Sequence, residues 1–232
     1  MIKKYNQFIN EEINWRKYNP FFRNKQYPVY YPVYTGDEID PYGEEDWNDE
    51  NLSPILLLAK RDGKPYDQIT KLNCSEQQLK SLEGIEHLTN LEILYCSNNQ
   101  LTNLRGVENL TKLTELSCSN NQLINLNGIE NLINLELLQC NHNQITSLDN
   151  IEKLVKLKHL TCNYNQLNDL NFIKFLKSLK SITCWNNKLT NLNGIENLTK
   201  LQAIYCRNNK ITEEYKKYLE GYCKKKKIVL YL

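Results

Sequence analysis

The sequence predicts an α/β repeat solenoid with a parallel sheet on its concave side, short turns on its convex side and a cap at each end. One observation is a cysteine every 22 residues, and another is the Leu or Ile two residues before each of the last six of these cysteines. A third is that the segments at both ends lack this period. One such unit buries too little apolar surface to fold alone, so neighbouring units must stack. The periodic cysteines are Cys74, Cys96, Cys118, Cys140, Cys162, Cys184 and Cys206.

The overall composition is that of a globular protein and excludes several other classes. The chain has 232 residues, of which 41% are hydrophobic and 24% charged, and this suits one or two folded domains. Its net charge of +2 creates no global field of the kind that attracts nucleic acid. No apolar run approaches the roughly 18 residues of a membrane span, and no apolar segment follows the basic start. We therefore expect a cytoplasmic protein.

Residues 1–52 differ in kind from the rest and are predicted to be an aromatic and acidic N-terminal arm or linker. Within them, the sequence Tyr-Pro-Val-Tyr at positions 27–30 is repeated at once at positions 31–34. Proline fixes its own φ and restricts the preceding residue, so this stretch is expected to be extended. The segment from Asp37 to Glu50 holds eight acidic residues and no basic one.

Residues 53–65 are predicted to form a helical N-terminal cap. Ser53 suits an N-cap, Pro54 suits the first helical position, and Gly63 suits the position after the helix end. The apolar residues between them would cover the open face of the first repeat.

Residues 66–211 are predicted to form seven 22-residue repeats. Within a repeat, Leu94 and Cys96 alternate with Tyr95 and Ser97, so the first pair faces the interior and the second pair faces the concave surface. The return segments, such as 127–131, are too short for long helices and should form convex turns or single 3₁₀ turns.

The repeat pattern resembles that of a known family. Leu91, Leu94, Cys96, Asn99 and Leu101 match the leucine-rich repeat signature, with cysteine in the third leucine position. The 22-residue length is similar to that of the bacterial internalins, which carry a signal peptide that we do not expect in this chain, and of a repeat-built regulatory subunit of type-1 phosphatase. The resemblance implies the fold, and it implies that the recurring asparagine bonds to the backbone of adjoining turns.

Residues 212–232 are predicted to form the C-terminal cap. Thr212 to Tyr222 has helical spacing, and Ile228 to Leu232 is β-prone, with Ile228 lying 22 residues after Cys206. The run Lys224–Lys227 between them is interpreted as a solvated turn, with a phosphate-binding site as the alternative.

The periodic cysteines are interpreted as small core residues. Stacked thiols about 5 Å apart could in principle form disulfides or bind a metal chain. However, they lie between leucine positions, their number is odd, and their Cβ vectors run parallel. A cysteine-dependent metal or redox protein remains an alternative, and the sequence predicts no role for Cys223.

Catalysis finds little support in the sequence, and we expect no enzyme, cofactor or metal. The chain has three histidines, His87, His142 and His159, and the last two would lie about 16 Å apart along the strands. There is no glycine-rich phosphate loop, no G-x-S-x-G and no C-x-x-C motif.

The concave surface of the last repeats carries the candidate binding residues. Exposed Trp, Tyr and Arg on a rigid sheet have the composition of an interface hot spot, and the Arg207 guanidinium could lie on the Trp185 indole. An alternative is that these residues contact the cap or the chain's own arm. The predicted partner-binding residues are His142, Tyr164, Trp185, Lys188, Tyr205, Arg207 and Lys210.

The sequence therefore predicts a non-enzymatic scaffold that binds a protein or peptide on the concave face of a leucine-rich repeat solenoid. The basic residues favour an acidic partner, and the acidic arm is a candidate for self-contact. No membrane partner is expected, and nucleic acid is disfavoured. An alternative is polyanion binding through C-terminal basic residues, which are Lys188, Arg207, Lys210 and Lys224–Lys227.

Overall fold

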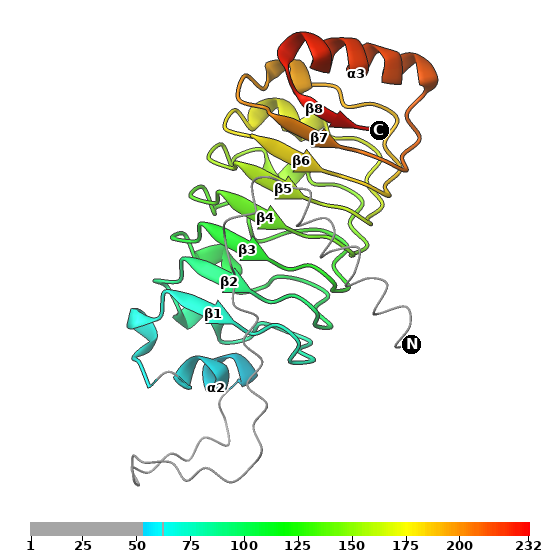
Figure 1. Cartoon of the computed structure of the whole chain (residues 1–232). Coiled ribbons are helices and arrows are strands. Elements are labelled where there is room, and N and C mark those ends of the chain that lie inside the picture. Colours follow the sequence, from blue (N-terminus) through cyan, green and yellow to red (C-terminus); the bar gives the residue numbers. More distant parts are fainter. Residues whose placement is uncertain (1–52, 62) are drawn as a thin grey trace, which may run out of the picture. The chain divides into compact units, whose positions relative to one another are not determined.

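The repeats stack into one parallel sheet of eight strands, which follow one another in space as they do in the sequence (Figure 1). The computed structural model describes residues 53–61 and 63–232. The predicted repeat solenoid with a parallel sheet is confirmed. The strands are β1 (Lys71–Asn73), β2 (Ile93–Tyr95), β3 (Glu115–Ser117), β4 (Leu137–Gln139), β5 (His159–Thr161), β6 (Ser181–Thr183), β7 (Ala203–Tyr205) and β8 (Val229–Tyr231).

Each strand forms because alternate residues can be buried on one face while the backbone pairs with both neighbours. Leu94 pairs with Leu116 and Tyr95 with Ser117, so equivalent residues of successive repeats lie side by side. Leu94 and Cys96 are fully buried, whereas Tyr95 is half-buried on the opposite face. The inward residues of all repeats form one continuous apolar core.

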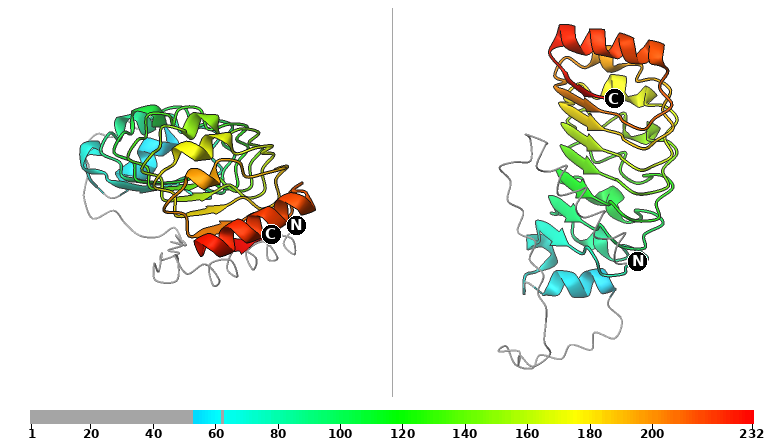
Figure 2. Two further views of the ribbon diagram at one scale, coloured as in Figure 1. Left: turned by 90° about the horizontal axis from the view of Figure 1, so that it is seen from above. Right: turned by 45° about the vertical axis from the view of Figure 1, so that its right-hand side comes forward.

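The convex side consists of turns and short 3₁₀ helices, as expected, and Figure 2 shows them on the side opposite the strands. Several of these helices begin after a glycine with positive φ, such as Gly106 at 98°. A Cβ there would lie 2.8 Å from the Ile85 side chain, so glycine suits both the dihedral angle and the space. The 3₁₀ helices are η2 (Tyr66–Gln68), η3 (Ile85–His87), η4 (Val107–Asn109), η5 (Asp149–Ile151), η6 (Asn171–Phe175) and η7 (Ile195–Asn197).

The N-terminal cap is the short helix α2 (Pro54–Lys60), as predicted. The Ser53 hydroxyl accepts a hydrogen bond from the Leu56 amide at 3.3 Å, and Pro54 occupies the first helical position. Gly63 has a φ of 63°, and its amide donates to the Lys60 carbonyl at 2.8 Å. It lies two residues after the C-cap Arg61, one position later than the sequence suggests.

The C-terminal cap is the helix α3 (Glu213–Lys226) followed by β8. The interpretation of Lys224–Lys227 as a turn was wrong, because Lys224 to Lys226 form the last helical turn and Lys227 closes it with a φ of 58°. Cations are stabilised at a helix C-terminus, which explains why the helix continues through them.

The register of the last strand also differs from the expectation. Ala203 pairs with Val229 and Tyr205 with Tyr231, so Ile228 is not opposite Cys206. The reason is that α3 contains more residues than the return segment it replaces.

The arm predicted for residues 1–52, including its acidic segment and its self-contact, lies outside the described residues. Within the described part of the chain, no helix is long and apolar enough to cross a membrane.

Candidate functional site

The recurring asparagine supports the sheet from inside, as the resemblance implies. In a typical repeat the Asn165 side-chain oxygen accepts from the Ile145 amide at 3.0 Å. Its amide group donates to the carbonyls of Cys140 at 2.9 Å and Cys162 at 3.2 Å. Each asparagine therefore joins its own turn to the preceding repeat, and this makes the concave surface rigid. The equivalent residues are Asn99, Asn121, Asn143, Asn187 and Asn209.

The periodic cysteines are buried thiols that form a second ladder. The Cys140 thiol donates to the Thr161 carbonyl of the next repeat at 3.4 Å. Burial raises the pKa of Cys118 to about 12, and a protonated, buried thiol is a poor nucleophile and metal ligand. No group of three His, Cys, Asp or Glu that could hold a metal occurs in residues 53–61 and 63–232. The ladder thus has the features of core packing.

The concave surface contains one more line of residues than the sequence analysis recognised. The first residue of each strand faces the same side as the third, because strand side chains alternate. This alternation was the signal that could have identified them. They are Lys71, Ile93, Glu115, Leu137, His159, Ser181, Ala203 and Val229.

His142 and Tyr164 lie at a turn with positive φ just after their strands. Their φ values are 51° and 54°, and their rings stack with centroids 4.1 Å apart. Most repeats have asparagine at this position, which adopts such angles more easily than other residues, for which the cost is about 1–2 kcal/mol. Burial lowers the pKa of His142 to about 4, so the imidazole is neutral at pH 7. The same position has a positive φ in every repeat, from Glu76 to Asn208, so only the stacking of the two rings distinguishes this pair.

Trp185, Tyr205, Arg207 and Tyr231 form an aromatic cluster at the C-terminal end of the concave face. Tyr205 stacks on Tyr231 with ring centroids 4.9 Å apart, and its centroid lies 6.3 Å from that of Trp185. The Arg207 guanidinium lies 5.9 Å from the Tyr231 ring centroid, not on Trp185 as expected. Tyr205 is only 6% exposed, so it supports its neighbours and presents little surface itself.

Lys188 and Lys210 are exposed and lie beside this cluster, on the turns that follow β6 and β7. The Lys188 ammonium donates to the Gln166 side-chain oxygen at 3.1 Å. The predicted site residues thus fall into three groups, which are the stacked pair, the aromatic cluster and the two lysines. Tyr231 was missed because the register of β8 could not be read from the repeat period.

Two polar atoms at the aromatic cluster are buried without a hydrogen-bond partner in the described structure. These are the indole nitrogen of Trp185 and the hydroxyl of Thr183, whose residue is fully buried. An unsatisfied buried polar group costs about 1–3 kcal/mol. Both atoms are closed off from solvent, so the accessible surface of the cluster consists of parts of Trp185, Arg207 and Tyr231.

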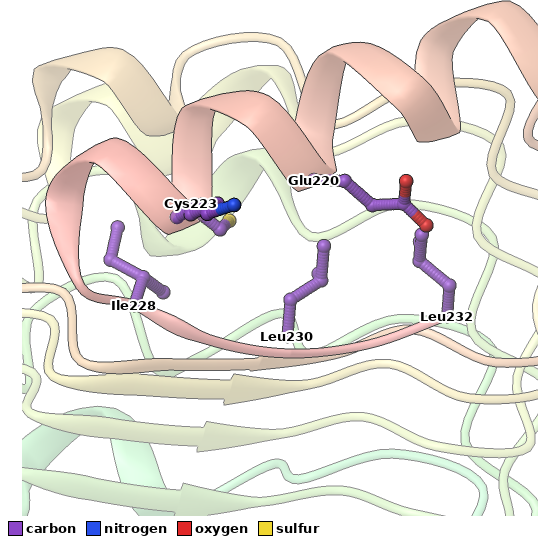
Figure 3. A pocket seen from close by; sticks show the side chains of 6 residues that line it. Glu220, Cys223, Ile228, Leu230 and Leu232 are labelled. Atoms are coloured by element: carbon purple, nitrogen blue, oxygen red, sulfur yellow. The ribbon is translucent and has the colours of Figure 1, made fainter.

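A separate pocket of about 330 Å³ lies between α3 and β8 (Figure 3). Ile228, Leu230 and Leu232 point into it from the strand, and Glu220, Cys223 and Lys224 line it from the helix. Burial raises the pKa of Cys223 to about 11, so its thiol is protonated near neutral pH and unsuited to nucleophilic catalysis.

Comparisons with known proteins support the repeat architecture. A family model described as leucine-rich repeats in two copies matches residues 67–109, 89–131 and 133–174. A search of curated proteins finds no match.

Solved structures similar to this chain include bacterial repeat proteins. Internalin C2 of Listeria monocytogenes is 27% identical, with 69% of this chain and 86% of that chain covered and a TM-score of 0.55. A leucine-rich repeat protein of Leptospira interrogans is 26% identical, with 72% and 49% covered and a TM-score of 0.58.

The functional domain of internalin J from Listeria monocytogenes includes a cysteine ladder. It is 27% identical, with 64% of this chain and 37% of that domain covered and a TM-score of 0.51. The chain thus spans about half of the Leptospira protein and little more than a third of the internalin J domain.

Proposed function

We propose that this chain, whose repeats match the leucine-rich repeat family model and resemble those of the internalins, is a non-enzymatic scaffold that binds a protein or peptide. The binding surface is the concave face of the C-terminal repeats. The family and its internalin-like neighbours support a protein-binding role in general, and the choice of surface rests on the residues of this chain.

The observation that carries this choice is the aromatic cluster, in which Arg207 and Tyr231 are exposed on the concave face. Aromatic residues and arginine dominate interface hot spots because they bury large areas with few rotatable bonds. Here Tyr205 holds Tyr231 and Trp185 in place by ring contacts.

The surface is organised before the partner arrives. The asparagine ladder fixes the strand ends, so binding requires little rearrangement of the sheet and loses little conformational entropy. Arg207, Lys188 and Lys210 place positive charge at and beside the cluster, which favours an acidic partner through complementary charge.

A binding titration tests this proposal. Partners are captured with the intact protein, identified, purified and titrated calorimetrically against the intact protein and the Trp185→Ala, Arg207→Ala double variant. We expect the double variant to bind at least about 100-fold more weakly, as loss of two hot-spot residues does.

The matched control is the Ser75→Ala, Ser97→Ala double variant, which changes the equivalent outward positions in the first two repeats. It should bind as the intact protein does, and both variants should unfold at nearly the same temperature as the intact protein. Equal affinity of all three proteins for the partner would show that the concave C-terminal face is not the binding surface.

A further inference from the structure

The small net charge of the chain conceals a strong separation of charge along the solenoid. Residues 149–232 carry 16 Lys and Arg against seven Asp and Glu, whereas residues 53–148 carry seven against ten. The C-terminal half is therefore basic. An uneven distribution of this kind indicates a charged interaction surface even where the total is near zero.

Many of these lysines gather along the edge of the sheet where the strands begin. A row of backbone hydrogen bonds, each 2.8 Å long, connects residues at or just before the start of successive strands. The Lys180 amide donates to the Lys158 carbonyl, and the Gln202 amide donates to the Lys180 carbonyl. The Val229 amide then donates to the Gln202 carbonyl. These bonds place Lys158 next to Lys180, and Gln202 and Val229 follow in that order towards β8. In the earlier repeats the same position holds Glu92, Thr114 and Glu136, so the edge changes from acidic to basic.

The last turn of α3 extends this edge to the end of the molecule. Figure 1 shows that α3 ends on the side where the strands start, from which the chain enters β8. The lysine edge, as we define it, consists of Lys156, Lys158, Lys177, Lys180, Lys200 and Lys224–Lys227. Successive strands are about 4.8 Å apart, so the edge extends over roughly 15 Å from β5 to β8.

Positive charge predominates at the lysine edge within the described residues, and one carboxylate, that of Glu220, lines the adjoining pocket. The ion pair of the lysine edge within residues 53–61 and 63–232 joins Lys158 to Glu136 at 2.6 Å. Two others bond to neutral groups, Lys156 to the Asn134 side chain and Lys177 to the Asn197 carbonyl. Like charges held this close repel one another, and an anionic partner would relieve this repulsion.

The pocket below α3 adjoins the lysine edge and adds an apolar component. Lys224 belongs to both, and the strand side of the pocket consists of Ile228, Leu230 and Leu232. A nucleic-acid backbone would use the lysines and leave these apolar side chains uncovered. A polypeptide that carries both carboxylates and a large apolar side chain can use both features.

We propose that the lysine edge and the pocket together form a second interaction surface, which binds an acidic polypeptide segment bearing a large apolar side chain. The carboxylates lie against the lysines while the apolar side chain enters the pocket of about 330 Å³. This surface does not include the aromatic cluster, so the inference stands independently of the concave binding site.

Fluorescence anisotropy with a labelled synthetic peptide tests the inference. The peptide contains eight glutamates and one phenylalanine, and it is titrated with the full-length protein at low salt. We expect the Lys180→Glu, Lys200→Glu variant to bind at least about 10-fold more weakly. The matched control is Lys80→Glu, Lys112→Glu, in which Lys112 holds the same place in its repeat as Lys200, and it should lose less than about 2-fold.

Further probes separate the alternatives. Replacing the phenylalanine of the peptide by serine should weaken binding about 5-fold or more, and the peptide should shift the methyl resonances of Leu230 and Leu232. The Trp185→Ala, Arg207→Ala variant should bind this peptide unchanged, so this inference and the proposed function can fail separately. The inference is overturned if both lysine variants lose affinity equally, if the serine peptide binds as well, or if a single-stranded oligonucleotide of equal charge binds more tightly.

Discussion

The first four repeats and the last three have the same interior and different surfaces. Leu94, Cys96 and Asn99 in the second repeat correspond to Ile182, Cys184 and Asn187 in the sixth, and all of these are buried. On the outside, Glu92 corresponds to Lys180 and Ser97 to Trp185. Stacking fixes the interior, since each repeat must fit two neighbours. The surface has no such requirement, so departures from the repeat there indicate function.

The strongest test of the shared interior is removal of one buried asparagine. Asn165→Ala leaves the Ile145 amide and the Cys140 carbonyl without their side-chain partner in a buried site, and we expect a loss of about 3 kcal/mol in the free energy of unfolding. Asn209→Ala, at the last repeat, should cost about half as much, because Asn209 is partly exposed and water can replace it. Urea unfolding measures the free energy of unfolding of both variants. Equal losses would show that the contribution of the asparagine does not depend on the position of its repeat in the solenoid.

A smaller effect on stability is expected from replacing glycine by alanine, and its sign should differ between a convex turn and the C-terminal cap helix. Gly106→Ala places a Cβ 2.8 Å from the Ile85 side chain at a φ of 98°, and we expect it to destabilise the fold by about 2 kcal/mol. Gly221→Ala lies within α3 with no atom within 4 Å of its added Cβ, and it should stabilise by up to about 1 kcal/mol. The unfolding temperature should therefore fall for Gly106→Ala and rise for Gly221→Ala. A change in the same direction for both variants would contradict the role given to Gly106 in the convex turn.

The smallest effect concerns the stacked pair that distinguishes the fourth and fifth repeats. Burial lowers the pKa of His142 from 6.5 to about 4. Between these values the unfolded chain binds a proton that the folded chain does not, so stability is lost as the pH falls from 6.5 towards 4. Because the imidazole is partly exposed, we expect this loss to be about 1 kcal/mol.

His142→Asn should remove that loss and also relieve the positive φ. Denaturant unfolding at pH 7.5 and pH 4.5 measures how much the free energy of unfolding changes between the two pH values. Tyr164→Asn makes the same backbone change one repeat later without removing a group that titrates in this range. If the free energy of unfolding depends on pH in the same way in both variants, His142 does not cause the loss of stability at low pH.

Sequence reasoning predicted the parts of the fold that depend on repetition. Cysteine spacing and the asparagine position were sufficient to predict the parallel sheet, its register through β7 and the buried ladders. The N-cap bond of Ser53 followed from local chemistry. These features depend on contacts between equivalent residues, which a period makes visible.

The candidate site was predicted less completely, because its contacts cross from the repeats to the cap. Arg207 lies over Tyr231, and Tyr205 is buried against the same ring. The partner of both belongs to β8, whose register depends on the length of α3. Of the lysine edge, the sequence analysis considered only Lys224–Lys227. The other lysines were missed because a net charge over the whole chain cannot show how charge is distributed. Counting the charged residues separately in the two halves of the solenoid would have indicated the basic C-terminal half.

The uninterrupted spacing between Cys74 and Cys206 has a consequence for how this protein can change over generations. Because the interior residues repeat at the same positions, a chain with one repeat more or fewer would still present matching faces to its neighbours and to the caps. Such a change would move α2 and α3 apart or together by about 4.8 Å. The length of the molecule, and thus the size of the target it can span, would be adjusted in whole steps.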